Sequence, residues 1–384
     1  MSRRVAIVFP FPLESFHLGK DLFLIPEGLR QLDFEVEMHC PAADRDVDWP
    51  LPVHTAGPSG LQRSEQYSGR GLSGAVVFSF LHYPRLLAAV RDAGLTVVAK
   101  GDTTGQTVAR AHPQATLTHA LFDQPTLAGR AVSLAHWLAR IGPLAGRDAR
   151  ELQQVLRLAD ATVVETQAAR DAVATALARA GADHLAQRLH VVGNPVGDIY
   201  TRAAVPAERE KLVVAVGRWD LAAKDAPLLA KALDRFLVQR PDHRVVIVGH
   251  GGEGRFGAAV ERVGHLSQNE LALLLGRARI VVTSSRWESY SLSSHEGLAM
   301  GCTVVGPALQ PLRDIVAAGD FGTTATRRDA AGLADALDRE AAAWEADRRD
   351  PLATSGFWRP RLAIEAVGGR YADLLASKLP LSLP

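Results

Sequence analysis

The chain has 384 residues, of which 47% are apolar, and 33 glycines, so it is long enough to bury two ordinary domain cores. With 43 Lys and Arg against 42 Asp and Glu, its formal charge of +1 provides no field that would recruit nucleic acid or an anionic membrane. Cys40 and Cys302 are far apart and lack a CxxC or Cys/His companion, which argues against a disulfide framework and against structural zinc.

Residues 1–12 carry only a short apolar run with two prolines, which fits a buried strand better than a signal peptide. No apolar run in the sequence reaches the roughly 18 residues that favour a transmembrane helix. We therefore expect a cytoplasmic protein without a transmembrane segment.

Short Val- and Ile-rich runs alternate with Ala- and Leu-rich helical patterns along the whole chain, which is typical of parallel sheets wound with helices. In the first half, strands are expected at 5–9, 35–39, 75–80, 95–100, 161–165 and 189–192. Helices are expected there near 20–31, 84–93, 128–140, 146–158 and 167–181.

A polar stretch broken by Pro195, Gly197 and Pro206 predicts an exposed linker at about 195–210. Beyond it, strands are expected at 212–216, 244–248, 262–264, 280–283 and 303–305. Helices are expected near 225–239, 268–277, 291–300, 311–317 and 329–346. A Trp/Pro stop at 357–360 precedes a last helical pattern, so the predicted division is 1–200, 201–360 and 361–384.

Two cations follow the strand at 212–216. Arg218 comes directly after Gly217, and Lys224 lies six residues later at the start of the next helix. A glycine lets the backbone turn closely, and two cations near a helix start can neutralise a diphosphate without a metal ion. The alternative is that both side chains only solvate a loop.

The strand at 244–248 is followed by Gly249, Gly251 and Gly254, a match by letter to the dinucleotide motif GxGxxG. That motif normally opens the first βαβ unit and is followed by an acid at the end of the next strand. Here it comes late, and the acid at that distance, Glu270, falls in a predicted helix. An oxidoreductase that binds a nicotinamide dinucleotide is therefore a rival interpretation that rests on these glycines alone.

Two carboxylates follow the strand at 280–283. Glu288 lies in the loop after the strand and Glu296, eight residues later, lies in the helix. Carboxylates beside sugar rings make charge-assisted hydrogen bonds that depend on where each hydroxyl sits. The unpaired N–H groups at the start of this helix favour a phosphate. Alternatively, both acids are ordinary surface or helix residues.

These elements occur in the order found in the retaining GT-B glycosyltransferases of family 4, also called glycosyl transferases group 1, which the sequence resembles over about 211–317. The shared pattern is Gly-Arg after a strand, a lysine, a glycine turn and two glutamates eight residues apart. The segment 263–267 also resembles the stretch that frames the nucleotide base in that family.

The resemblance implies an α/β protein of GT-B fold: two Rossmann-like, doubly wound parallel-sheet domains, with a C-terminal helix that crosses back to the first. It implies retaining transfer of a sugar, most commonly a hexose from UDP, to an unknown acceptor, with no metal ion or cofactor. Arg218 and Lys224 would hold the diphosphate, Glu288 the sugar and Glu296 the ribose. The donor contacts it implies are Gly217, Gly249, Gly251, His265, Leu266, Ser289, Tyr290, Ser291, Leu292 and Glu296.

The sequence departs from the family at two places. Ser289, Tyr290 and Ser291 stand where the family often has glycines, and Asp102 stands where its first domain usually has a histidine. The resemblance gives Asp102 a catalytic place, although an aspartate that caps its own turn is an equal alternative. Other candidates in the first domain are His17, Lys20 and His82. A triplet of acids at 44–48 has the spacing of a metal motif, but it falls in a variable loop, where we expect solvated charges.

Other functions remain open at this point. A two-domain protein that binds a sugar or nucleotide without reacting, or an inactive transferase-like subunit, would show the same alternation of strands and helices. The acceptor cannot be assigned, because variable loops of the first domain, such as 42–70 and 112–127, would recognise it.

Overall fold

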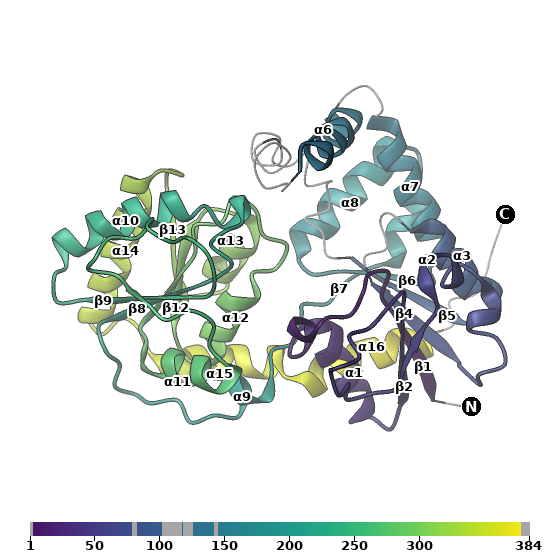
Figure 1. Ribbon diagram of the computed structural model, residues 1–384. Coiled ribbons are helices and arrows are strands. Elements are labelled where there is room, and N and C mark those ends of the chain that lie inside the picture. Colours follow the sequence, from purple (N-terminus) through teal and green to yellow (C-terminus); the bar gives the residue numbers. More distant parts are fainter. Residues whose placement is uncertain (1–2, 79–82, 102–116, 118–125, 142–144, 378–384) are drawn as a thin grey trace. The chain divides into compact units, whose positions relative to one another are not determined.

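The computed structural model describes residues 3–78, 83–101, 117, 126–141 and 145–377 (Figure 1). The chain divides into two compact units. The first comprises 1–107, 142–195 and 363–384, and the second comprises 108–141 and 196–362.

The first unit contains a parallel sheet of seven strands in the order β3-β2-β1-β4-β5-β6-β7. Its strands are β1 (Arg4–Val8), β2 (Glu35–Cys40), β3 (Val53–Thr55), β4 (Gly74–Phe78), β5 (Thr96–Lys100), β6 (Ala161–Val164) and β7 (Leu189–Val191). The central strands are buried on both faces, which is why they read as continuous apolar runs. The sequence did not indicate β3, because its three residues, VHT, are too few and too polar to give such a run.

Helices cover both faces of this sheet and give the unit two apolar cores. They are α1 (Asp21–Arg30), α2 (Gly57–Gly60), α3 (Pro84–Asp92), α7 (Ala145–Leu158), α8 (Gln167–Arg179) and α16 (Ile364–Ala376). The last helix, α16, packs on α1, so the predicted return of the C-terminal helix to the first domain is confirmed. A Cβ on Gly28 would lie 2.9 Å from the Cα of Gly368, so this close crossing needs glycine on both helices.

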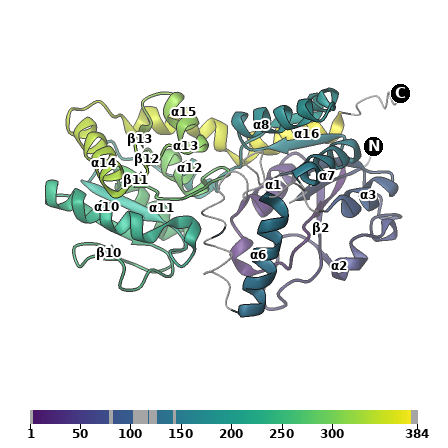
Figure 2. The ribbon, with the colours of Figure 1, turned by 90° about the horizontal axis from the view of Figure 1, so that it is seen from above.

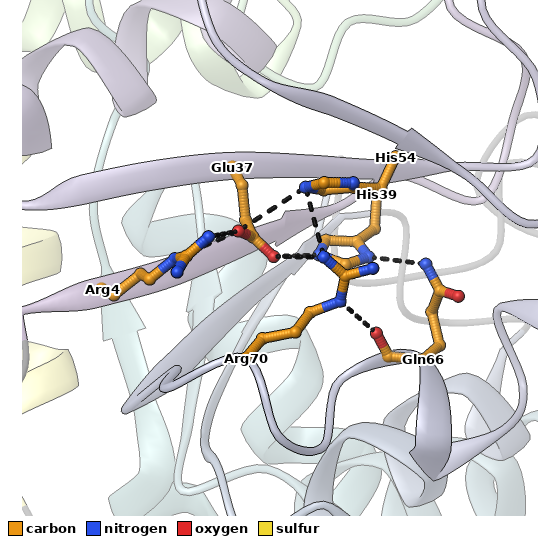
Figure 3. A network of polar contacts seen from close by, with 6 residues as sticks. All are labelled: Arg4, Glu37, His39, His54, Gln66 and Arg70. Atoms are coloured by element: carbon orange, nitrogen blue, oxygen red, sulfur yellow. Dashed lines mark hydrogen bonds and ion pairs between the residues drawn. The ribbon is translucent and has the colours of Figure 1, made fainter.

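A polar network lies at the β3-β2-β1 edge of the same sheet (Figure 3). Its centre is the buried carboxylate of Glu37, which accepts from Arg4 Nη2 at 2.6 Å and from His39 Nε2 at 2.8 Å. Gln66 Nε2 lies 3.1 Å from Nδ1 of His39. His39 therefore fits this site as a neutral ring that donates through Nε2 and accepts through Nδ1.

The second unit contains a parallel sheet of six strands in the order β10-β9-β8-β11-β12-β13. Its strands are β8 (Leu212–Val216), β9 (Arg244–Val248), β10 (Glu261–Arg262), β11 (Ile280–Val282), β12 (Thr303–Pro307) and β13 (Gly322–Ala325). The edge strand β13 was not predicted, because its sequence, GTTA, has none of the large apolar residues that mark the others.

Two layers of helices enclose this second sheet. These helices are α9 (Asp198–Thr201), α10 (Ala226–Gln239), α11 (Gln268–Arg277), α12 (Leu292–Ala299), α13 (Gln310–Ala317), α14 (Ala330–Glu345) and α15 (Pro351–Leu362), and the unit also includes α6 (Leu127–Ile141). Side chains of α10 and α14 fill one core, and both views place these helices side by side (Figure 2). The other core contains residues of α9, α11, α12, α13 and α15.

The predicted Trp/Pro stop was wrong: α15 runs through it with Pro360 inside the helix. Trp358 and Leu362 of this helix are buried against the sheet, and burial of these side chains outweighs the backbone hydrogen bond that proline removes. Within the described ranges, no helix is long and apolar enough to cross a membrane.

The network around Glu37 predicts an acid-sensitive fold. Burial lowers the pKa of His39 to about 4, below the 6.5 of a free imidazole, so the folded state binds a proton less readily than the unfolded chain. The contribution of His39 to the free energy of unfolding is therefore fully present above pH 6.5. As pH falls from 6.5 to 4, His39 should account for a loss of about 3 kcal/mol.

The measurement is denaturant unfolding at pH 7 and pH 5 for wild type, His39→Gln and, as a control, the exposed residue change His184→Gln. H39Q should lose less stability on acidification than wild type, and H184Q should lose as much as wild type. An equal loss in all three would contradict the assignment.

Candidate active site

The loops after β8, β9 and β11 meet at the carboxyl edge of the second sheet. β8 pairs with β9 on one side and with β11 on the other, so the chain changes direction between β8 and β11. Open α/β sheets bind ligands outside the carboxyl ends of the strands at this kind of switch point. Lys224 follows β8 and Glu288 follows β11, so the two residues flank it.

Lys224 and Glu288 contact each other directly. Nζ of Lys224 lies 2.6 Å from Oε1 of Glu288, and their side chains are only 24% and 13% exposed. Ser285 Oγ also donates to Oε1 of Glu288 at 2.6 Å, and Ser284 Oγ donates to the backbone carbonyl of Lys224 at 2.6 Å. Two residues that the sequence assigned to separate parts of a donor thus form one partly buried ion pair.

Arg218 lies in the same loop as Lys224 but in a different environment. Its side chain is 65% exposed, and Nη2 pairs with Oδ2 of Asp220 at 2.9 Å. The hydrogen bond and the charge of Asp220 raise the pKa of Arg218, which therefore stays cationic. The guanidinium is thus available to an anion that displaces a single, exposed carboxylate.

The glycine turn after β9 packs against the loop after β8. Gly249 has φ +113°, and a Cβ there would overlap the carbonyl oxygen of Gly217. A Cβ on Gly251 would lie 2.7 Å from the Cβ of Asp220, and the backbone N–H of Trp219 donates to the backbone carbonyl of His250 at 2.7 Å. Contact between the two loops therefore explains Gly249 and Gly251 without a nicotinamide dinucleotide.

His265 comes next to this turn, because its ring stacks on that of His250 with centroids 5.6 Å apart and planes 10° apart. Both rings are exposed, whereas Leu266 packs partly into the core. Ser267 then caps α11 in a box with Glu270, which accounts for the acid at the spacing of the dinucleotide motif.

The loop that carries Glu288 continues through Ser289 and Tyr290 to Ser291, the N-cap of α12. Ser291 has the left-handed value φ +67° and is buried. His295 is also buried; its ring stacks on Tyr290 at 3.9 Å, and burial lowers its pKa to about 4. The first turn of α12, from Leu292, is thus held rigidly, and Glu296 follows one turn later.

Sequence reasoning missed one charged cluster beside Lys224. The buried carboxylate of Asp225 accepts from Arg286 Nη2 at 3.2 Å and from Arg328 Nη2 at 2.7 Å. These residues come from the loops after β8, β11 and β13. The sequence shows an acid directly after the predicted lysine, but it does not show that this acid has arginine partners, because Arg286 and Arg328 are 61 and 103 residues away.

The candidates of the first unit are less defined. Asp102 and His82 lie outside the described residues. His17 lies between the rings of Phe9 and Phe16, and burial lowers its pKa, while Lys20 is exposed. The described part of this unit therefore brings no first-domain candidate to a defined site.

Asp242, His243 and Glu345 are a possible metal-ligand group, with one atom of each within 4.8 Å of the others. Lys211 Nζ lies 2.5 Å from Asp242 and 2.8 Å from Glu345, and Arg240 also pairs with Glu345. Since both carboxylates are already neutralised by cations, the group fits an ion-pair network better than a metal centre.

Residues 210–341, which contain Arg218, Lys224, Asp225, Glu288 and Glu296, match the family model described as Glycosyl transferases group 1. This segment is a glycosyl transferases group 1 domain. The predicted family is therefore confirmed for the part of the chain that carries Arg218, Lys224, Glu288 and Glu296.

Curated relatives match the chain over part of their length. The D-inositol 3-phosphate glycosyltransferase of Frankia alni is 40% identical over 101 residues, 26% of this chain and 22% of that protein. The glycogen synthase of Mycobacterium tuberculosis is 33% identical over 144 residues, 33% of this chain and 35% of that protein. The chain thus matches about a third or less of each relative.

Solved structures extend the likeness to nearly the whole chain. The lipopolysaccharide outer core galactosyltransferase WaaB has a TM-score of 0.66 at 13% identity, covering 98% of this chain and 100% of that one. Anabaena Alr3699/HepE, solved in complex with UDP and glucose, has a TM-score of 0.63 at 13% identity, with the same coverage. At these identities the likeness concerns the fold, and it confirms the predicted GT-B class.

The packing of the glycine turn predicts unequal effects of two alanine substitutions in this glycosyl transferases group 1 domain. Gly249→Ala should lower the free energy of unfolding by about 3 kcal/mol or more, because its Cβ meets the backbone of Gly217. Gly254→Ala should cost only about 1 kcal/mol, since Gly254 has φ +66° but open space around it. Denaturant unfolding of both variants tests this; equal costs would mean that loop contact does not explain Gly249.

Proposed function

We propose that the protein transfers a sugar from a nucleoside diphosphate sugar to an acceptor. The observation that carries this proposal is the Lys224–Glu288 ion pair of 2.6 Å at the switch point of the second sheet, with the exposed cation Arg218 in the same loop. A cation for the diphosphate and a carboxylate for sugar hydroxyls are the two groups that recognition of such a donor needs.

Donor binding exchanges partners within this set. A diphosphate offers Lys224 more negative charge than one carboxylate does, so the ammonium turns to the phosphates and Glu288 is released. Glu288 then accepts hydrogen bonds from sugar hydroxyls while keeping that from Ser285. Each charge has a partner before and after the exchange, which avoids leaving a partly buried charge unpaired.

Arg218 is proposed to stabilise the charge that develops on the departing diphosphate. It replaces the exposed carboxylate of Asp220 with phosphate oxygens, an exchange favoured by the planar guanidinium and by the greater charge of the ligand. Glu296 of α12 is proposed to bind the ribose, and the turn from Gly249 to Gly251, with His265 and Leu266, to border the nucleotide.

We further propose that the transferred sugar is a hexose carried by UDP and that its anomeric configuration is retained. UDP and glucose in the structure of Anabaena Alr3699/HepE, a protein of the same fold, support this choice of donor. In this mechanism the leaving phosphate deprotonates the acceptor on the face it departs from, and the protein contributes position and charge. Asp102 is proposed to contact the sugar or acceptor.

Thermal-shift screening against UDP, GDP, ADP, dTDP and their sugars tests donor binding. A ligand of the folded state must raise the melting temperature by mass action, and we expect UDP and a UDP-hexose to do so. No shift with any of these nucleotides would contradict the proposal. A shift without transfer to any acceptor would instead indicate a binding protein or an inactive subunit.

Arg218→Ala separates the role of this side chain from folding. Because the side chain of Arg218 is exposed and its ion pair is with Asp220, which is exposed too, its removal should leave stability within about 0.5 kcal/mol of wild type. Turnover should fall about 100-fold or more. Arg244→Ala is the matched control: Arg244 is also exposed and ion-paired but begins β9 at the opposite end of the sheet. Near-normal transfer by R218A would contradict its role.

A further inference from the structure

Asp225 adopts a backbone conformation that its residue type disfavours. Its φ is +48° and its ψ is 52°, in the left-handed region that glycine occupies most readily. The residue lies between the short 3-10 helix η5 (Ala222–Lys224) and the start of α10. An aspartate here must therefore contribute something that glycine cannot supply.

Helix capping does not explain the aspartate. Asp225 occupies the N-cap position of α10, where aspartate is common because its side chain accepts from the first turn of the helix. In this structure the side chain makes no such capping bond. Its carboxylate instead receives Arg286, with Nε 3.2 Å from Oδ2, and Arg328, with Nη2 2.7 Å from the same oxygen.

Strained residues gather at the donor loops. The non-glycine residues with positive φ in the described chain are Asp33, Asp225, Ser291 and Asp347. Asp225 and Ser291 are buried beside Lys224 and α12, whereas Asp33 and Asp347 are exposed in turns after helices. Buried strain that surrounding contacts hold in place is typical of functional sites.

The contacts of Asp225 belong to a set that fixes the turn carrying Lys224. Arg286 N–H donates to the carbonyl of Ala223 at 2.8 Å, and Ser284 Oγ donates to that of Lys224 at 2.6 Å. Arg328 Nη2 also donates to the carbonyl of Ser284 at 3.2 Å. Three successive residues of the turn are thus held by the loop that leads to Glu288, with Arg328 bridging from the loop after β13.

We propose that Asp225 is a positioning residue: with Arg286 and Arg328 it forms an ionic clamp that sets the direction of the Lys224 ammonium. This rests on the proposed function, in which Lys224 receives the donor diphosphate. The clamp keeps the ammonium at the switch point through the exchange of Glu288 for phosphate, so binding need not order a flexible turn.

The clamp predicts a change in nucleotide affinity opposite in sign to the change expected from the charge of Asp225 alone. Removing a carboxylate beside an anion site should strengthen anion binding by electrostatics alone. If Asp225 positions Lys224, its removal weakens binding instead. Asp225→Gly lacks the side chain, and Asp225→Asn keeps an acceptor oxygen without the charge; both residues adopt the left-handed backbone readily, so neither adds backbone strain to the turn.

The experiment is calorimetric titration of UDP, GDP, ADP and dTDP into wild type, D225G, D225N and the control Asp347→Gly. Asp347 also has a positive φ, +52°, but is exposed after α14. For the nucleotide that binds wild type best, we expect D225G to bind about tenfold more weakly, D225N to lie between, and D347G to match wild type. Equal or tighter binding by D225G would overturn the clamp.

A second measurement needs no nucleotide and separates failure of the clamp from failure of the proposed function. An amine-acetylating reagent should modify Lys224 faster in ligand-free D225G than in wild type or D347G, because the clamp holds the ammonium against Glu288. Equal rates in all three would overturn the clamp even if nucleotides bind. Faster modification in D225G without binding of any nucleotide by wild type would uphold the clamp and contradict the donor assignment.

Discussion

The ion pair between Lys224 and Glu288 is the contact around which the second unit's ligand loops are arranged. It joins the loop after β8 to the loop after β11, on the two sides of the point where the chain changes direction. Separating the members of a partly buried pair leaves each charge without compensation, so the two side chains hold each other in place. The same requirement makes the site selective, because a ligand that separates the pair must satisfy both charges.

Close packing and strain keep the loops around this pair in position. Gly249 and Gly251 let the turn after β9 lie directly on the loop after β8, and Asp225 holds a left-handed turn under two arginines. Because these contacts fix the backbone of the loops, ligand binding does not have to order them. Two glycines of the triplet that matches a nucleotide motif by letter, Gly249 and Gly251, therefore serve first to let the two loops pack together.

Much of the fold could be predicted because buried parallel strands leave continuous Val and Ile runs, as in 212–216 and 244–248. The strands β3 and β13 lack those runs, because each is a short strand at the edge of its sheet and is only partly shielded from solvent. Pro360 led to the wrong prediction of a helix stop, because packing of the buried side chains of α15 outweighs the local preference of proline. Local patterns thus predicted the strands that are buried on both faces and missed the edge strands β3 and β13 and the effect of packing on Pro360.

The candidate site was predicted in part. The sequence placed Lys224 and Glu288 at the right strand ends, because residue type and position after a strand are visible in it. Their direct contact was not foreseen, since it depends on the spatial order β9-β8-β11. The contact between Asp225 and Arg328 joins residues 103 positions apart, so no local sequence pattern predicts it. Asp102 stays a prediction, because it lies outside the described residues.

The exchange of partners at Glu288 is the central claim, and calorimetric comparison of wild type with Glu288→Gln tests it most directly. The titrants are a nucleoside diphosphate and its sugar conjugate. The claim predicts that E288Q binds the bare diphosphate more tightly, because Lys224 no longer has to leave a carboxylate, and that the sugar no longer adds affinity. Unchanged affinities for both titrants would contradict it.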